Sequence, residues 1–208
     1  MISILRASPE DAEQLTQITI ASKRHWNYPE KWIQLWLPAL TISQQYILEN
    51  EVWVAVENKK AVGYYSLKLQ HVIARRTFSP TKQSLYYWRR LLRRSAPRNT
   101  CTALRSLALP ARASVVQRRC DVNLLWLDNL WVLPEFMGRG IGPQLFQHAL
   151  ERSRERGESV LKIEADPNAQ SFYEKMGARQ IGEHHSEVDG QMRVLPVMEI
   201  SISPRFTK

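Results

Sequence analysis

A mixed α/β fold, with helices on both faces of a central sheet, is predicted by three features of the sequence. Strand-like and helix-like segments follow one another as strand, helix, helix, strand, strand, insertion, strand, helix, strand, helix, strand. A glycine-rich loop joins a late apolar strand to an amphipathic helix. One long segment is strongly basic, whereas the rest of the chain is mildly acidic. With 208 residues, 44% of them hydrophobic, the chain is long enough to bury a core.

The N-terminal half contains three predicted strands and a long helical region. Residues 2–6 alternate as a short strand, and Ser8-Pro9-Glu10-Asp11 is a typical helix start, with serine as N-cap and proline in the first turn. Residues 22–50 hold further helical material that is rich in tryptophan. Residues 51–57 alternate as a strand does, with Val52, Val54 and Val56 on one side, and residues 61–69 form a second predicted strand after a polar turn, which together predict a β-hairpin.

The C-terminal half returns to alternating strands and helices. The predicted order is strand, helix, strand, helix and strand, over residues 124–132, 143–156, 160–165, 168–176 and 194–202. The helix over 143–156 has one apolar and one polar face, and glycine follows its last residue as a stop signal. One or two strands are expected after residue 178.

The run Met137-Gly138-Arg139-Gly140-Ile141-Gly142 lies between a strand and a helix, which is a typical setting for an anion site. Glycine lets the backbone turn tightly and approach a ligand closely. The first amides of a helix have no partner within it, and the helix dipole adds partial positive charge there. A pyrophosphate fits such a site with Arg139 beside it, although a plain strand-to-helix turn explains the glycines alone equally well.

Two other phosphate-binding loops do not fit this run. The Rossmann fingerprint places Gly-x-Gly-x-x-Gly after the first strand, whereas these glycines come late and at a different spacing. A Walker loop requires Gly-Lys-Ser/Thr, which is absent from the sequence.

Two stretches of the chain resemble the signatures of GNAT acetyltransferases. Residues 130–142 resemble the motif Gln/Arg-x-x-Gly-x-Gly/Ala after a strand that ends in Val-x-Pro. Residues 164–178 resemble the second motif, Asn-x-x-Ala-x-x-Phe-Tyr-x-x-x-Gly-Phe, with slightly shifted spacing, and residues 22–28 resemble a segment of one bacterial branch. The resemblance covers everything outside 71–120, and it implies a single N-acetyltransferase domain whose mixed sheet is mostly antiparallel.

The resemblance implies that acetyl-CoA is the co-substrate and that a primary amine of a small molecule or peptide is the acceptor. Tyr173 would lie near the thioester sulfur and protonate the departing thiolate, unless it is simply a packed helix-face aromatic. Met137 replaces the family's usual Gln or Arg, and Pro143 lacks an N–H, so weakened pyrophosphate binding is expected. The expected contacts to acetyl-CoA are Leu130, Val132, Gly138, Arg139, Gly140, Ile141, Gly142, Asn168 and Tyr173.

An amine acceptor must lose a proton before it attacks, which calls for a carboxylate or a water chain. Glu164 is slightly favoured as the catalytic base, Asp128 is second, and Glu135 beside the glycine loop is third. A solvated or ion-paired carboxylate is the alternative for each of them. The residues predicted to line the acceptor pocket are His25, Trp26 and Tyr28.

The positive charge of the chain is concentrated in one segment. Residues 71–120 carry 12 of the 29 Lys and Arg residues and none of the 20 Asp and Glu residues. Residues 82–94 could form a basic amphipathic helix, which gives the alternative function of a GNAT-shaped protein that binds CoA, nucleic acid or an anionic membrane. We favour a disordered insertion, or one with no selected role.

The remaining residues limit the class of protein further. His184-His185 lacks further ligand partners, so no metal site is predicted. Cys101 and Cys120 are interpreted as free thiols in a reducing cytoplasm. No apolar run approaches the roughly 18 to 20 residues of a membrane span. A homodimer is compatible with the sequence.

Overall fold

A computed structural model of the chain describes residues 2–74 and 120–203. The chain divides into two compact units, residues 1–69 with 125–208 and residues 70–124. The first unit contains the glycine loop and every helix of the described residues. Nearly all of the predicted basic segment, including the helix expected over 82–94, lies outside the described residues.

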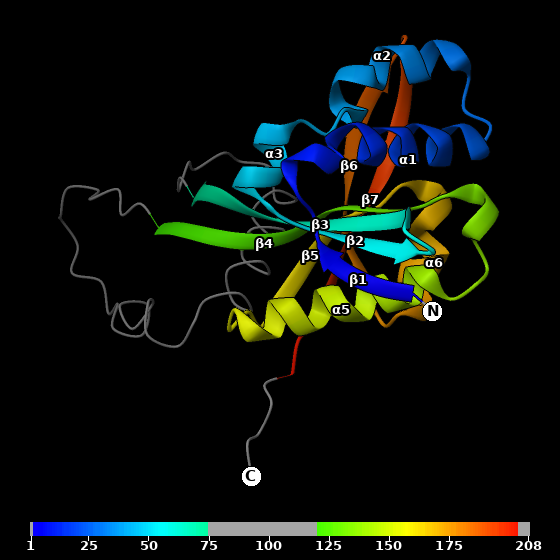
Figure 1. The fold of residues 1–208 in the computed structure, drawn as a ribbon. Helices are drawn as coiled ribbons and strands as arrows, with labels where there is room; N and C mark the ends of the chain where they lie inside the picture. The colour runs from blue at the N-terminus through cyan, green and yellow to red at the C-terminus, as the bar shows by residue number, and fades with distance from the viewer. Residues whose placement is uncertain (1, 75–119, 204–208) are drawn as a thin grey trace, which may run out of the picture. The chain divides into compact units, whose positions relative to one another are not determined.

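The first unit is built on a mixed sheet, which Figure 1 shows as a ribbon. The strand order is β1-β2-β3-β4-β5-β7-β6, with β4 and β5 parallel and β1–β2, β2–β3, β5–β7 and β6–β7 antiparallel. The strands are β1 Ile2–Arg6, β2 Glu51–Glu57, β3 Lys60–Ala74, β4 Cys120–Val132, β5 Val160–Glu164, β6 Arg179–Val188 and β7 Gln191–Ser201. The predicted α/β fold with a mostly antiparallel sheet is confirmed.

Helices cover both faces of this sheet, with α1, α2 and α3 on one side and α5 and α6 on the other (Figure 1). Their bounds are α1 Ala12–His25, α2 Glu30–Leu40, α3 Gln44–Glu49, α5 Ile141–Glu155 and α6 Gln170–Lys175, with short 3-10 turns at Pro9–Asp11, Pro134–Phe136 and Pro167–Ala169. None of the helices in the described ranges is long and apolar enough to cross a membrane.

Most predicted elements are confirmed, and their ends differ for local reasons. Ser8 precedes a 3-10 turn, and its backbone N–H donates to the Asp11 carboxylate at 2.7 Å, so the helix proper starts later than its cap. Helix α5 begins at Ile141, two residues before the expected start, because Gly140 is its N-cap. The C-terminal tail forms two strands, which pair as a hairpin.

Alternation along the strands divides the core between the two faces. In β2, Ala55 packs with the α5 side chains Phe146 and Ala149, whereas Val52 and Val54 pack on the opposite face with α1. Because every second side chain points to the same face, one strand serves both clusters. The sheet is therefore buried on both sides, as a layered α/β architecture requires.

Gly63 on β3 permits a close approach between the backbones of β3 and β4. A Cβ atom added at this position would lie 2.7 Å from the carbonyl oxygen of Trp131 and 3.2 Å from Leu145 Cδ1. A few residues farther along β4, the Leu133 N–H donates to Val62 O at 2.8 Å. Glycine here allows β3 to hold the end of β4 in place.

We predict that Gly63→Ala lowers the free energy of unfolding by about 1–3 kcal/mol, because the added methyl group meets backbone that is fixed by sheet pairing. Urea denaturation at pH 7 should show a lower midpoint with an unchanged m-value. An unchanged midpoint would mean that β3 and β4 can separate here at no cost.

Candidate active site

Strands β4 and β5 pair over only a short stretch and then separate. The parallel register joins Trp126 to Lys162 and Leu127 to Ile163, and no later pair forms among the described residues, although β4 continues to Val132. Two parallel strands that diverge in this way leave unpaired backbone groups between them. We call this the β4–β5 opening.

The opening begins where the side-chain alternation of β4 changes phase. Leu125 and Leu127 lie in the α5-side core, and so do Leu130 and Val132. Strict alternation would put residue 129 on that side as well. One extra residue at Asp128-Asn129 shifts the alternation, so that Leu130 and Val132 face α5 instead of residues 129 and 131. This is the pattern of a β-bulge, which often ends regular strand pairing.

Both bulge side chains reach the same hydroxyl on the opposite face. The Tyr46 hydroxyl, on α3, lies 2.5 Å from Asp128 Oδ2 and 3.0 Å from Asn129 Nδ2. Ser66 Oγ lies 2.7 Å from the same hydroxyl. Burial and then the charge of Asp128 raise the pKa of Tyr46, so its hydroxyl stays protonated and donates to the exposed Asp128 carboxylate.

The last residues of β4 turn polar backbone groups toward the opening. The N–H of Leu133 points to β3. The backbone N–H and C=O groups of successive residues in a strand point alternately to its two neighbours, so those of Leu130 and Val132 point away from β3, toward the opening. The carbonyl oxygen of Val132 lies 2.8 Å from Ser22 Oγ, a buried hydroxyl on α1. Helix α1 therefore contacts the β4 side of the opening.

The next residue of α1 reaches the β5 side. Lys23 Nζ forms an ion pair with Asp166 Oδ2 at 2.5 Å, and the two side chains are only 10% and 6% exposed. Burial lowers the pKa of Lys23, and the carboxylate opposes that shift. Burial also disfavours the charge of Asp166, but Lys23, the backbone N–H of Asn168 and the Tyr28 hydroxyl together outweigh it, and the pKa of the carboxyl is lowered.

The second oxygen of Asp166 organises the residues that follow β5. Asp166 Oδ1 accepts from the Tyr28 hydroxyl at 2.8 Å and from the backbone N–H of Asn168 at 3.0 Å. The Asn168 side-chain amide donates to the Tyr28 hydroxyl at 3.0 Å, and Arg193 donates to it at 3.2 Å. This network brings the predicted Tyr28 and Asn168 together.

Aromatic rings surround the two cations of this network. Lys23 Nζ lies 5.1–5.7 Å from the ring centroids of Trp26, Tyr28, Trp36 and Trp131. The guanidinium of Arg193 lies 4.5 Å from the centroid of Trp36. Such contacts compensate part of the hydration that buried cations lose. They also place the predicted Trp26 against Trp131, with centroids 5.7 Å apart.

The glycine loop adopts a conformation that its glycines make possible. Gly138 and Gly140 have φ values of 76° and 79°, in the left-handed region, and both are exposed. Gly140 is the N-cap of α5, and its carbonyl accepts from the Gln144 N–H at 3.2 Å. The amides of Ile141 and Gly142 thus stand in the first turn, where a helix offers no internal acceptor.

Two charged residues near the loop are engaged with other groups. The guanidinium of Arg139 stacks 4.7 Å from the ring centroid of Phe136 and lies 3.9 Å from Glu57. Glu135, the third candidate base, pairs with Lys60 at 3.3 Å, and its own backbone amide lowers the pKa of its carboxyl most. Both side chains lie on the exposed surface.

Tyr173 lies beneath the sheet, in the core on the α5 side. Its ring contacts Phe146 and Phe172, with centroids 5.8 and 5.1 Å away, and the residue is 6% exposed. Burial, and then the charge of Asp166, raises the pKa of Tyr173. In the part of the chain that the structure describes, its hydroxyl has no hydrogen-bond partner.

Two other predicted residues lie apart from the opening. Glu164 is exposed, and its carboxylate lies 2.9 Å from Nδ1 of His184 on β6. Since β7 and β6 lie on the far side of β5 from β4, this contact directs Glu164 away from the opening. His25 is exposed at the end of α1 and makes no polar or ring contact within the described ranges.

Several residues of the site were missed by the sequence analysis. They are Ser22, Lys23, Tyr46, Ser66, Asn129, Trp131, Asp166 and Arg193. Two signals were present: Asp166 precedes a proline in the second signature, and Asp128-Asn129 is a polar pair inside an apolar strand. Within the described residues no group of three or more His, Cys, Asp and Glu side chains could hold a metal ion.

Comparisons with known proteins agree with this architecture. The profile of the Acetyltransferase (GNAT) family matches residues 13–178. An uncharacterized N-acetyltransferase in the pepI 3′ region of Lactobacillus delbrueckii subsp. lactis is 37% identical over 67 residues, which are 31% of this chain. Those residues are only 39% of that relative, well under two thirds of its length.

Two solved structures share the fold. A GCN5-related N-acetyltransferase from Rhodopseudomonas palustris has a TM-score of 0.61 and 18% identity, over 96% of this chain and 94% of that one. A GNAT family acetyltransferase from Brucella melitensis, in complex with acetyl-CoA, has a TM-score of 0.55 and 16% identity, over 100% and 92%. Since the family profile spans most of the chain, the protein belongs to the GNAT family of acetyltransferases.

We predict that Asp166→Asn lowers the free energy of unfolding by about 3 kcal/mol at pH 7, because Lys23 and Arg193 stay buried without a carboxylate. Asp189→Asn, which removes an exposed partner of Lys31, should cost less than about 1 kcal/mol.

The pH dependence of this difference follows from the lowered pKa of Asp166. A carboxyl group whose pKa is lowered on folding stabilises the folded protein at pH values above its ordinary pKa of 3.8. This stabilisation is lost as the pH falls from that value through the lowered pKa of the folded state. Urea denaturation should therefore show a gap between wild type and Asp166→Asn at pH 7 that narrows toward pH 3. Equal costs for the two variants at pH 7 would contradict a structural ion pair.

Proposed function

We propose that the protein is an acetyl-CoA-dependent N-acetyltransferase that acts on a primary amine of a small molecule or peptide. The observation that carries this proposal is the β4–β5 opening, which has the glycine loop at one end and the Asp128 carboxylate at the bulge. Membership of the GNAT family supports the class of reaction. The acetyl-CoA complex of the Brucella melitensis relative supports the co-substrate.

The chain's own groups fit acetyl-CoA. The pyrophosphate would lie against the exposed backbone of Gly138 and Gly140 and the first-turn amides of α5, where the helix dipole favours anions. Pro143 supplies no amide, so Ile141 and Gly142 carry this role. The pantetheine arm would pair with the backbone of β4 at Leu130 and with the N–H of Val132, because the carbonyl of Val132 already accepts from Ser22. Asn168, held by Asp166, would contact the arm from the β5 side.

The reaction requires two proton transfers. The acceptor amine, as its neutral form, attacks the thioester carbonyl carbon, a C–N bond forms, and the C–S bond breaks to release the CoA thiolate. Asp128, directly or through water, takes the proton from the amine, since its carboxylate is exposed beside the opening and held by Tyr46. Tyr173, whose pKa is raised, is protonated at neutral pH, and its hydroxyl would donate to the sulfur; the proton that Asp128 took would then return to the phenol through water.

The acceptor would approach from the face that carries α1 and α2. Trp26, Tyr28 and Trp131 supply apolar surface there, and His25, at the exposed end of α1, stays a predicted wall residue. The Lys23, Arg193 and Asp166 groups have a net charge of +1, which disfavours a polyamine and favours an acceptor amine in its neutral form.

We expect acetyl-CoA to raise the melting temperature, and Gly138→Ala to weaken its binding by about tenfold, because a side chain strains the left-handed backbone of the loop. Gly157→Ala is a matched control, since Gly157 has φ 77° and equally open surroundings at the other end of α5. Isothermal titration of both variants checks this. Equal affinities in the two variants, or no melting shift at millimolar acetyl-CoA, would remove the loop from the site.

We expect Tyr173→Phe and Asp128→Asn each to lower kcat by about 10²-fold, with little change in the affinity for acetyl-CoA. Glu164→Gln should retain most of the activity, because its carboxylate is directed toward His184. Release of CoA thiol across a panel of amines measures all three variants. The assignment of Asp128 fails if Glu164→Gln, and not Asp128→Asn, abolishes turnover, and an unchanged kcat removes Tyr173 from the mechanism.

A further inference from the structure

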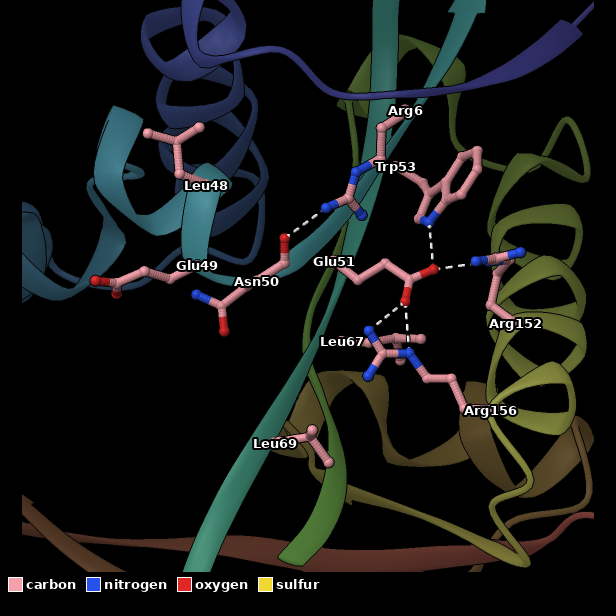
Figure 2. A pocket seen from close by; sticks show the side chains of 10 residues that line it. All are labelled: Arg6, Leu48, Glu49, Asn50, Glu51, Trp53, Leu67, Leu69, Arg152 and Arg156. Atoms are coloured by element: carbon pink, nitrogen blue, oxygen red, sulfur yellow. Dashed lines mark hydrogen bonds and ion pairs between the residues drawn. The ribbon is translucent and has the colours of Figure 1, made fainter.

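A polar hollow lies at the end of α5 opposite to the glycine loop. Its volume is about 460 Å³, which suits a small organic molecule. Figure 2 shows three arginines, Arg6, Arg152 and Arg156, around it. The apolar side chains that line it are Leu48, Leu67 and Leu69.

Two of the arginines share one buried carboxylate. Glu51 is 6% exposed and accepts from Arg152 Nε at 2.7 Å, from Arg156 Nε at 2.6 Å and from the indole N–H of Trp53 at 3.0 Å. Burial alone would raise the pKa of Glu51, but these donors together lower it to about 2. Glu51 therefore stays charged and fixes both guanidinium groups at the edge of the hollow.

The third arginine has no carboxylate partner among the described residues. Arg6 donates to the backbone oxygen of Asn50 at 2.8 Å, and its guanidinium lies 5.9 Å from the ring centroid of Trp53. Glu49, the other acid at this hollow, accepts from Gln45, and its side chain points away from the arginines in Figure 2. Arg152 also pairs with Glu155, so three guanidinium groups at this hollow pair with two carboxylates, Glu51 and Glu155, and one positive charge, on Arg6, is left without a carboxylate partner in the described residues.

The apolar wall adds a second requirement for a ligand. Leu48 is 67% exposed and Leu69 is 49% exposed, so both present uncovered hydrocarbon at the hollow. An inorganic ion would leave this surface in water, whereas a short apolar body would cover it. A cationic ligand is disfavoured by the excess of guanidinium groups.

We propose that this hollow binds an organic anion, with a carboxylate or phosphate monoester head on Arg6 and Arg156 and a short apolar body against Leu48 and Leu69. The site is distinct from the glycine loop, because α5 separates them by about 20 Å at 1.5 Å per residue. It therefore does not depend on the proposed acetyl transfer.

The test uses the full chain with hexanoate, hexyl phosphate, hexan-1-ol and hexylammonium at constant ionic strength. We expect at least one of the two anions to raise the melting temperature with concentration, and the alcohol and the ammonium ion to have little effect. The head group that binds more tightly identifies the class of anion. The Trp53 indole signal in ¹H–¹⁵N spectra, assigned with Trp53→Phe, should shift on titration, because this N–H donates to Glu51 at the hollow.

Variants locate the site. Arg6→Gln should weaken anion binding at least fivefold, and Arg6→Lys should retain part of it. Arg24→Gln, at an exposed arginine that pairs with Glu30, is the matched control and should bind like wild type. The proposal is overturned if neither anion binds, if hexan-1-ol binds as tightly as the anions, or if Arg6→Gln and Arg24→Gln bind the anion equally.

Discussion

The ion pair between Lys23 and Asp166 is the contact on which the geometry of the site depends. Ser22 contacts the carbonyl of Val132 at the end of β4, and the next residue along α1 binds the carboxylate just after β5. Two consecutive residues of one helix therefore set the distance between two strands that no longer pair with each other. Beyond the last paired residues, Leu127 and Ile163, this link joins the ends of β4 and β5.

Such a pair is stable only where its surroundings replace water. Taking both charges out of water costs several kcal/mol per ion, and attraction repays this only when every polar atom is satisfied. Both oxygens of Asp166 have donors, from Lys23, Tyr28 and the backbone of Asn168. The aromatic rings around Lys23 and Arg193 provide the remaining compensation. The tryptophan-rich character of α2 thus serves electrostatics as well as packing.

Local patterns were sufficient to predict the fold but not the contacts across the site. Alternation in residues 51–57 and the glycines of the loop are properties of short segments, and they predicted the elements well. Lys23 and Asp166 are separated by 143 positions, and their pairing follows only from the folded sheet. The insertion predicted over about 71–120 falls within the second compact unit, residues 70–124, and β3 continues into its first residues as far as Ala74.

The choice of base shows the same limit. The sequence slightly favoured Glu164 with Asp128 second, and both acids lie on predicted strands. The structure adds two facts that no window of sequence contains: the pairing of Glu164 with His184, two strands away, and the bulge that exposes Asp128. The polar pair Asp128-Asn129 was visible in the sequence, but only packing on both sides reveals that one of the two residues is extra.

Helix α5 connects the two proposed sites through opposite ends of its dipole. Its N-terminus offers free amides and partial positive charge, which suits the pyrophosphate of a co-substrate. Its C-terminal turn carries partial negative charge, so Arg152 and Arg156 are favourable there even before a ligand binds. Glu51, on β2, then fixes these two arginines by ion pairs. Arg6 has no carboxylate partner in the described residues, so its charge stays available to a ligand. The asymmetry of one helix would therefore favour the proposed pyrophosphate site at its start and the arginines of the second proposed site at its end.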